Sequence, residues 1–150
     1  MQFQFNDGGR QLAGYKGSTG DCVVRAIAIA SEKPYAEVYD ALFEANKQFA
    51  DDHYGRIARR IQRKGGTPRD GTFRQVYEAY LKSLGFVWKT CMRIGTGCKV
   101  HLTSEELPKG RLVCRVSKHL VAVIDGVIND TYNCSRGGSR CVYGYYIKEA

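Results

Sequence analysis

The stretch SKHLVAVIDGVIND, residues 117–130, decides the predicted fold of the second half of the chain. Its two apolar runs are separated by Asp125 and Gly126, and Asp-Gly between apolar runs is a strong signal for a two-residue hairpin turn. With this turn, Ile124 pairs with Val127, and the register of the whole hairpin follows from that pair.

The register places two chemically useful side chains on one face of the sheet. Val121 faces Asp130 across the ladder, and Asn129 points away. His119 faces Tyr132 in the same ladder. Paired residues share a face, and diagonal neighbours lie roughly 7–8 Å apart at the backbone. We therefore expect the Asp130 carboxylate to orient the His119 imidazole.

A second stretch, CVVRAIAIA at residues 22–30, is almost wholly apolar and rich in Ala, which predicts a buried helix. Asp21 is a candidate N-cap and Thr19 is another, and either places Cys22 in the first turn. A thiol attacks as its thiolate, and a helix N-terminus together with a nearby imidazolium lowers its pKa. The Asp21 carboxylate would raise that pKa if it pointed at the sulfur instead of capping the helix. We predict that Cys22 is a nucleophile with His119 as its base.

The remaining elements follow the order of helices first and strands after. Pro34 begins a second, amphipathic helix, and Thr72 with Gln75 forms a capping-box pattern that begins a third helix, which Gly85 ends. Helices before strands predict an α+β fold in one domain over residues 1–150, with the helices packed on a C-terminal antiparallel sheet. The strand-like apolar runs are 86–88, 112–116, 120–124, 127–128 and 142–147.

The net charge of +8 is concentrated in one segment. Between His53 and Arg69 the chain has six cations and no acidic residue, which leaves only +2 for all other residues. This pattern predicts a basic helix or loop insertion at about 53–70. The segment is either a solvated surface or a patch for nucleic acid or an acidic protein. Its cations are Arg56, Arg59, Arg60, Arg63, Lys64 and Arg69.

The N-terminus lacks the pattern of a signal peptide, and no apolar run is long enough to span a bilayer. We therefore expect a soluble, cytoplasmic protein without membrane contact, whose six cysteines are reduced. Cys134 and Cys141 flank a Gly-rich loop, and we expect them to face each other, where oxidation would join them. Six residues separate these two, as they do Cys91 and Cys98. Structural zinc pairs have roughly two to four, so neither a metal nor a cofactor is predicted.

Two short segments resemble the papain-like cysteine peptidase superfamily. They are GDCVVRA at residues 20–26 and SKHLVAV at residues 117–123, the second leading into Asp130. The order of elements is similar from about Asp7 to Tyr146, most of all to small bacterial and phage members akin to bacteriocin-processing double-glycine peptidases.

In papain-like families the nucleophile opens the central helix, the histidine lies on a strand and an Asn or Asp follows. The resemblance implies a papain-like fold and the catalytic residues Cys22, His119 and Asp130. It implies a hydrolase, a thiol protease or isopeptidase, that acts on a peptide or protein substrate.

The chemistry expected of these residues is acyl transfer through a thioester intermediate. Backbone N–H groups at the helix start would stabilise the oxyanion, with Gln11 as a candidate side-chain donor. Two simpler interpretations stay open, because Cys22 could be a small buried apolar residue and His119 a structural one. In that case the chain would be a non-catalytic papain-like module that binds through the segment from Arg56 to Arg69.

Overall fold

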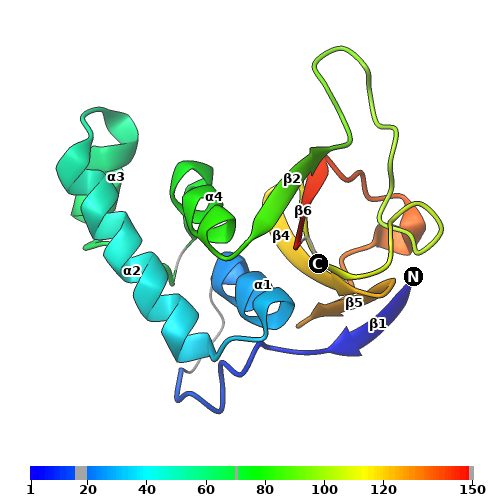
Figure 1. The fold of residues 1–150 in the computed structure, drawn as a ribbon, viewed down its shortest axis with the longest axis horizontal. Coiled ribbons are helices and arrows are strands. Elements are labelled where there is room, and N and C mark those ends of the chain that lie inside the picture. Colours follow the sequence, from blue (N-terminus) through cyan, green and yellow to red (C-terminus); the bar gives the residue numbers. More distant parts are fainter. Residues whose placement is uncertain (16–19, 70, 149–150) are drawn as a thin grey trace.

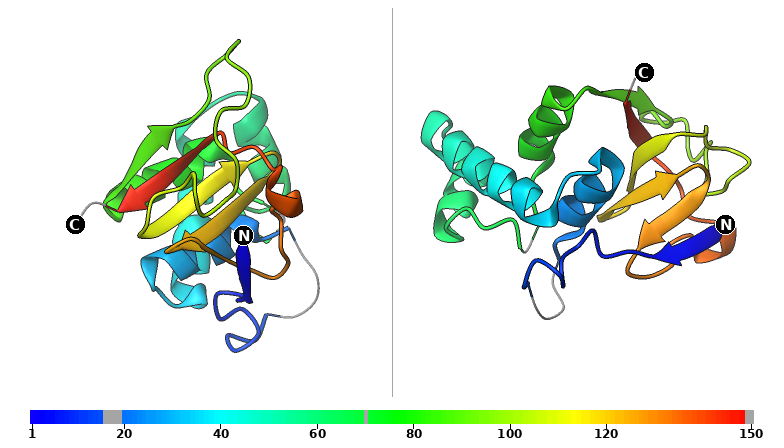
Figure 2. Two further views of the ribbon diagram at one scale, coloured as in Figure 1. Left: turned by 90° about the vertical axis from the view of Figure 1, so that its right-hand side faces the viewer. Right: turned by 60° about the horizontal axis from the view of Figure 1, so that its bottom comes forward.

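A mixed β-sheet forms the centre of the fold in the computed structural model, which describes residues 1–15, 20–69 and 71–148. Over these residues the sheet has six strands in the spatial order β1-β5-β4-β3-β6-β2. The N-terminal strand lies at one edge (Figure 2). The strands are β1 Gln2–Phe5, β2 Phe86–Thr90, β3 Arg111–Val116, β4 His119–Ile124, β5 Val127–Asp130 and β6 Gly144–Lys148.

Four α-helices in the described part of the chain lie on one side of this sheet, so the predicted α+β class is confirmed. The innermost helix, α1, contacts β3, β4 and β5 and lies between the sheet and α2 (Figure 1). The helices are α1 Cys22–Ser31, α2 Tyr35–Asp52, α3 Arg56–Arg63 and α4 Arg74–Ser83, and a short 3-10 turn, η1, covers Arg136–Gly138.

The buried helix predicted from residue 22 onward is confirmed as α1. All eight residues from 23 to 30 are buried, which fits a helix enclosed between a sheet and other helices. Its apolar side chains pack against Val113, Leu120 and Ala122 on the facing side of the sheet. This packing holds the N-terminal end of α1 close to the start of β4.

The second and third predicted helices are also present, but the third begins later than expected. Phe73, with an extended backbone, is the N-cap of α4, and no side chain caps the helix. The Thr72 hydroxyl is buried without a partner among the described residues. Phe73 packs beside Ile61 and Val76, so the chain stays extended through this residue and the predicted capping box does not form.

The prediction of an antiparallel sheet is correct for five strands and wrong for β1. That strand pairs in parallel with β5, from Gln2 opposite Val127 to Phe5 opposite Asp130. The predicted hairpin register is confirmed where β4 meets β5, since Ile124 pairs with Val127. The sheet is therefore mixed, and its β1 edge depends on a contact between residues far apart in sequence.

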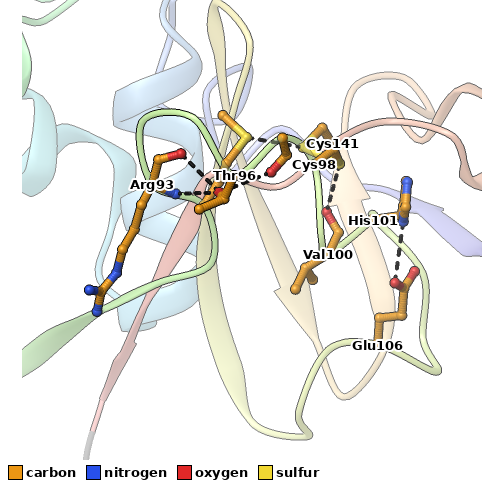
Figure 3. Close-up of a disulfide and its surroundings, with 9 residues drawn as sticks. Arg93, Thr96, Cys98, Val100, His101, Glu106 and Cys141 are labelled. Carbon is orange, nitrogen blue, oxygen red and sulfur yellow. Dashed lines mark hydrogen bonds and ion pairs between the residues drawn. A yellow bond between two sulfur atoms is a disulfide. The ribbon is translucent and has the colours of Figure 1, made fainter.

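The predicted pairing of Cys134 with Cys141 is wrong, as is the expectation that all six cysteines are reduced. Cys98 forms a disulfide with Cys141, with 5.8 Å between their Cα atoms (Figure 3). The Leu102 N–H donates to the Arg140 carbonyl at 2.8 Å, which holds the two segments side by side. Cys134 is buried in the apolar cluster on the face of the sheet away from α1, and its sulfur lies near His119 and Asp130.

The basic segment at 53–70 contains a helix, α3, that packs against α2 on the side away from the sheet (Figure 1). Ala58 and Ile61 are its buried residues. None of the helices in the described ranges combines the length and the apolar character needed to cross a membrane.

Candidate active site

Cys22 is the first residue of α1, where the sequence predicted it, and its side chain is half-buried. Asp21 occupies the N-cap position, but its carboxylate makes no capping hydrogen bond. The expectation that Asp21 caps the helix is therefore wrong, and the alternative cap, Thr19, lies outside the described residues. The first N–H groups of α1, which lie beside the thiol, are therefore not capped by the Asp21 side chain.

His119 and Asp130 form a buried hydrogen bond at the open end of the hairpin. His119 begins β4, Asp130 ends β5, and His119 Nε2 lies 2.7 Å from Asp130 Oδ2. A carboxylate only accepts, so Nε2 is the donor. The Thr131 N–H also donates to Asp130, at 2.7 Å, and the Tyr132 ring centroid lies 5.4 Å from that of His119. The diagonal contact predicted from the register is present.

The imidazole and the Cys22 thiol line the same cavity, and His119 is close enough to lower the pKa of that thiol. This proximity depends on the position of His119 at the very end of its strand. Its same-face neighbour Val121 belongs to the cluster on the side away from α1, with Cys134, while Leu120 packs against α1. At the strand end the ring can reach both sides, and the Leu120 N–H approaches the Cys22 thiol there.

Electrostatics favour the charged pair over the neutral one. Burial by itself would raise the pKa of Cys22, but the hydrogen bond and charge of His119, the Leu120 N–H and the charge of Arg25 together lower it. Burial opposes the charge on His119, yet its hydrogen bonds with Asp130, Cys134 and Cys22 raise the pKa of the imidazole far above its usual value. A thiolate beside an imidazolium is the favoured state.

The thiols of Cys91 and Cys114 contrast with that of Cys22. Burial raises the pKa of Cys91, and it raises that of Cys114 further because this side chain is fully enclosed. Only a thiol in an electropositive and partly accessible environment is expected to be reactive. Cys22 has that environment.

Sequence reasoning missed Arg25, which joins the two buried carboxylates near the site. Its guanidinium donates to Asp21 Oδ1 and lies 3.4 Å from Asp130 Oδ1. Asp21 also accepts from the Tyr35 hydroxyl and pairs with Arg10 Nε at 3.2 Å. An Arg in an apolar helix four residues after an Asp was a signal for this network, because positions i and i+4 are neighbours on a helix.

This network neutralises the charge of Asp21 with two guanidiniums. The sequence left open whether the Asp21 carboxylate would point at the sulfur, and its contacts with Arg10, Arg25 and Tyr35 give the answer. The carboxylate is completely buried among these groups. Arg25 also holds Asp130 in place behind the imidazole.

A cavity of about 620 Å³ opens over Cys22 and His119. Its described walls come from the start of α1, the segment at 71–74 and the turn between β3 and β4. Gln11 is not among the described residues that line it. Its side chain is exposed, and its backbone N–H donates to Asp7 at 3.0 Å. The role of Gln11 as an oxyanion donor therefore stays a prediction, beside the first N–H groups of α1.

The side chains could offer a metal only one closely spaced set of ligands in the described part of the chain, namely His119, Asp130 and Cys134. A metal there would have to replace the hydrogen bond between Nε2 and Oδ2. The two cysteine pairs considered for zinc, Cys91 with Cys98 and Cys134 with Cys141, each lose one thiol, because Cys98 and Cys141 are joined in a disulfide.

No known family model, curated protein or solved structure matches this chain. The site is accordingly defined by its own geometry, a thiol at a helix start, an imidazole at a strand end and a buried carboxylate.

Proposed function

We propose that the chain is a papain-like cysteine-dependent amide hydrolase or acyl transferase, most plainly a peptidase or isopeptidase. Cys22 is the nucleophile, His119 is the base and then the acid, and Asp130 orients the imidazole. One observation carries the proposal. The thiol and the imidazole line one cavity, and the imidazole forms a 2.7 Å hydrogen bond with a buried carboxylate, which is the arrangement that activates a nucleophile.

The reaction follows from these contacts. The Cys22 thiolate adds to the carbonyl carbon of an amide, and the carbonyl oxygen becomes an oxyanion that N–H groups at the α1 start stabilise. The His119 imidazolium gives its proton to the leaving nitrogen, the C–N bond breaks and an amine leaves. The thioester then reacts with water or a second amine, whose proton His119 takes, and the thiol is released.

The first test measures how fast each cysteine reacts with iodoacetamide at pH 7, read by mass spectrometry of tryptic peptides. Two unit charges about 4 Å apart at an effective dielectric constant of about 20 attract by about 4 kcal/mol. This energy corresponds to about three pKa units, or roughly a thousandfold loss of thiolate, and the more basic thiolate that remains reacts faster. Removing the imidazole in His119→Ala should therefore slow labelling of Cys22 on the order of a hundredfold.

A matched control is His101→Ala. His101 also contacts a carboxylate, Glu106 at 3.2 Å, but at the surface (Figure 3), so its removal should leave the rate for Cys22 unchanged. Labelling of Cys22 no faster than that of Cys91, or an equal rate in His119→Ala, would contradict the proposal.

The second test looks for the reaction itself. The protein is incubated with a peptide mixture from a digested proteome, and new termini are mapped by mass spectrometry. Cleavage or ligation products should form with the native chain and be lost in Cys22→Ala. Products that persist in Cys22→Ala would show that another group or a contaminant is responsible.

A second candidate function, binding of nucleic acid or an acidic protein, rests on helix α3. Its four arginines and the following Lys64 are all exposed, and none of the five forms an ion pair with a described residue. A salt titration of binding to a generic DNA duplex tests it, because each lost phosphate contact reduces the slope of log K against log salt by about 0.9. The triple variant Arg59→Gln, Arg63→Gln, Lys64→Gln should flatten that slope, and no binding by the native chain at low salt would exclude the duplex.

A further inference from the structure

The walls of the cavity over Cys22 carry positive charge and no described carboxylate. Arg74, Arg115 and Lys118 line it, and a neighbouring cavity of about 530 Å³ shares Arg74, Arg115 and Tyr143 with it. The described walls of that second cavity also lack Asp and Glu. A surface of this kind favours a substrate with negative charge.

Arg115 lies on the α1 side of the sheet, near the thiol. It pairs with Leu120 across β3 and β4, and paired residues share a face. Leu120 packs against α1, and its N–H approaches the thiol of Cys22. The side chain of Arg115 is therefore next to the residue that borders the nucleophile.

The direction of β3 along α1 supports the same placement. Arg111, four residues before Arg115, donates to the Ala30 carbonyl at 2.8 Å near the end of α1. The four residue steps from Arg111 to Arg115 cover about 13 Å of strand, and the eight steps from Cys22 to Ala30 cover about 12 Å of helix. Arg111 therefore marks the C-terminal end of α1, and Arg115 reaches its N-terminal end.

The charge of Arg115, which lies on β3 in the wall of the cavity, has no acidic partner among the described residues. Its guanidinium lies 5.4 Å from the ring centroid of Tyr143. In contrast, Arg74 pairs with Glu78 at 3.2 Å and stacks over Trp88. The ring of Tyr143 holds the Arg115 guanidinium without neutralising it, which leaves its donors for a ligand.

Two further donors at this cavity are buried and have no acceptor among the residues that the structure describes. They are the Nε of Arg25 and the hydroxyl of Thr72, and both residues line the cavity wall. A buried donor without an acceptor costs free energy. A ligand that brings acceptor oxygens into the cavity would remove that cost.

We propose that Arg115 determines specificity by binding a carboxylate of the substrate next to the amide that Cys22 attacks. This inference rests on the proposed function, since it names the substrate class of the same site. The carboxylate is either an acidic side chain of a peptide or its C-terminal group. A planar guanidinium forms two parallel hydrogen bonds with either one.

The test compares two reagents of nearly the same size, iodoacetate and iodoacetamide, as probes of Cys22. The quantity measured is the rate of labelling by iodoacetate divided by the rate of labelling by iodoacetamide. General changes in thiol reactivity cancel in this ratio. A hydrogen bond to a charged group contributes enough to change this ratio about tenfold. Arg115→Gln should lower the ratio about tenfold, and Arg115→Lys should restore part of it.

The matched control is Arg59→Gln, which removes one positive charge on α3 outside the cavity, and it should keep the native ratio. An unchanged ratio in Arg115→Gln, or an equal fall in Arg59→Gln, overturns the role of Arg115 while fast labelling of Cys22 by iodoacetamide still supports the proposed function. If iodoacetamide labels Cys22 of the native chain no faster than Cys91, the proposed function and this inference both fail.

Protection experiments then identify the source of the carboxylate. N-acetylglutamic acid 1-amide carries only a side-chain carboxylate, N-acetylalanine only a terminal one, and N-acetylglutamine amide neither. Stronger protection of Cys22 by the first compound indicates an acidic side chain, and by the second a chain terminus. Equal protection by both acids supports a carboxylate site open to either, and stronger protection by the neutral amide contradicts the proposal.

Discussion

The substitution Arg25→Met removes the charge that joins the two buried carboxylates. The Arg25 side chain is only 7% exposed and contacts Asp21 and Asp130, which are themselves buried. Met has a similar length and no charge, so it fills the space without replacing the ion pairs. The expected result is a large loss of stability.

The size of this loss follows from the contacts that remain. Each hydrogen bond to a charged group contributes about 1.5–3 kcal/mol, and breaking a buried pair costs about 3–5 kcal/mol. Asp21 keeps Arg10 and Tyr35, and Asp130 keeps His119. The free energy of unfolding should therefore fall by about 3 kcal/mol, at the lower end of this range.

Urea unfolding followed by fluorescence measures the change. With a slope of about 2 kcal/mol per M, a loss of about 3 kcal/mol lowers the midpoint by about 1.5 M. The control is Lys33→Met, which breaks the exposed pair between Lys33 and Glu37 at 3.6 Å and should change stability by less than about 1 kcal/mol. A loss in Arg25→Met as small as in the control would refute the reasoning.

Four further outcomes are expected. The pKa of Cys22 is lowered, so its labelling by iodoacetamide should stay fast at pH values where ordinary thiols are protonated and should fall only in acid. Labelling rates measured over a pH series should show this fall at a higher pH in His119→Ala. A thiol assay of the denatured, unreduced chain should find four thiols, and six after reduction. Loss of the Cys98–Cys141 bond, which spans 43 residues, in the double Ser variant should cost about 4 kcal/mol in urea unfolding. Gly144→Ala places a Cβ 2.3 Å from the ring of Trp88, so the free energy of unfolding measured in urea should fall by about 1–3 kcal/mol. An unchanged free energy of unfolding would contradict that contact.

The sequence by itself determined the elements whose cause is local. The Asp125-Gly126 turn set the register of the hairpin, and this register already placed His119 diagonal to Asp130. The apolar run after Cys22 predicted a buried helix, with that residue in its first turn. Such patterns are readable because a turn type and a hydrophobic period depend on neighbouring residues alone.

Four features depended on residues that are distant in sequence. Gln2–Phe5 is a short edge strand that pairs only because β5 offers a free edge. Cys141 reaches Cys98 because the two backbone segments run side by side. Phe73 packs against other helices and delays the start of α4. Arg25 was expected in an apolar helix, and only the folded chain supplies both of its carboxylates.

The candidate site itself shows the same division. The sequence paired the imidazole with a carboxylate, because both lie on one hairpin. Only the tertiary structure brought the thiol of Cys22 to His119. Val121, which shares a sheet face with His119, lies on the side of the sheet away from α1, so strand alternation alone does not predict this contact. The contact is possible because His119 is the first residue of its strand, and no local pattern in the chain encodes where α1 begins relative to that strand.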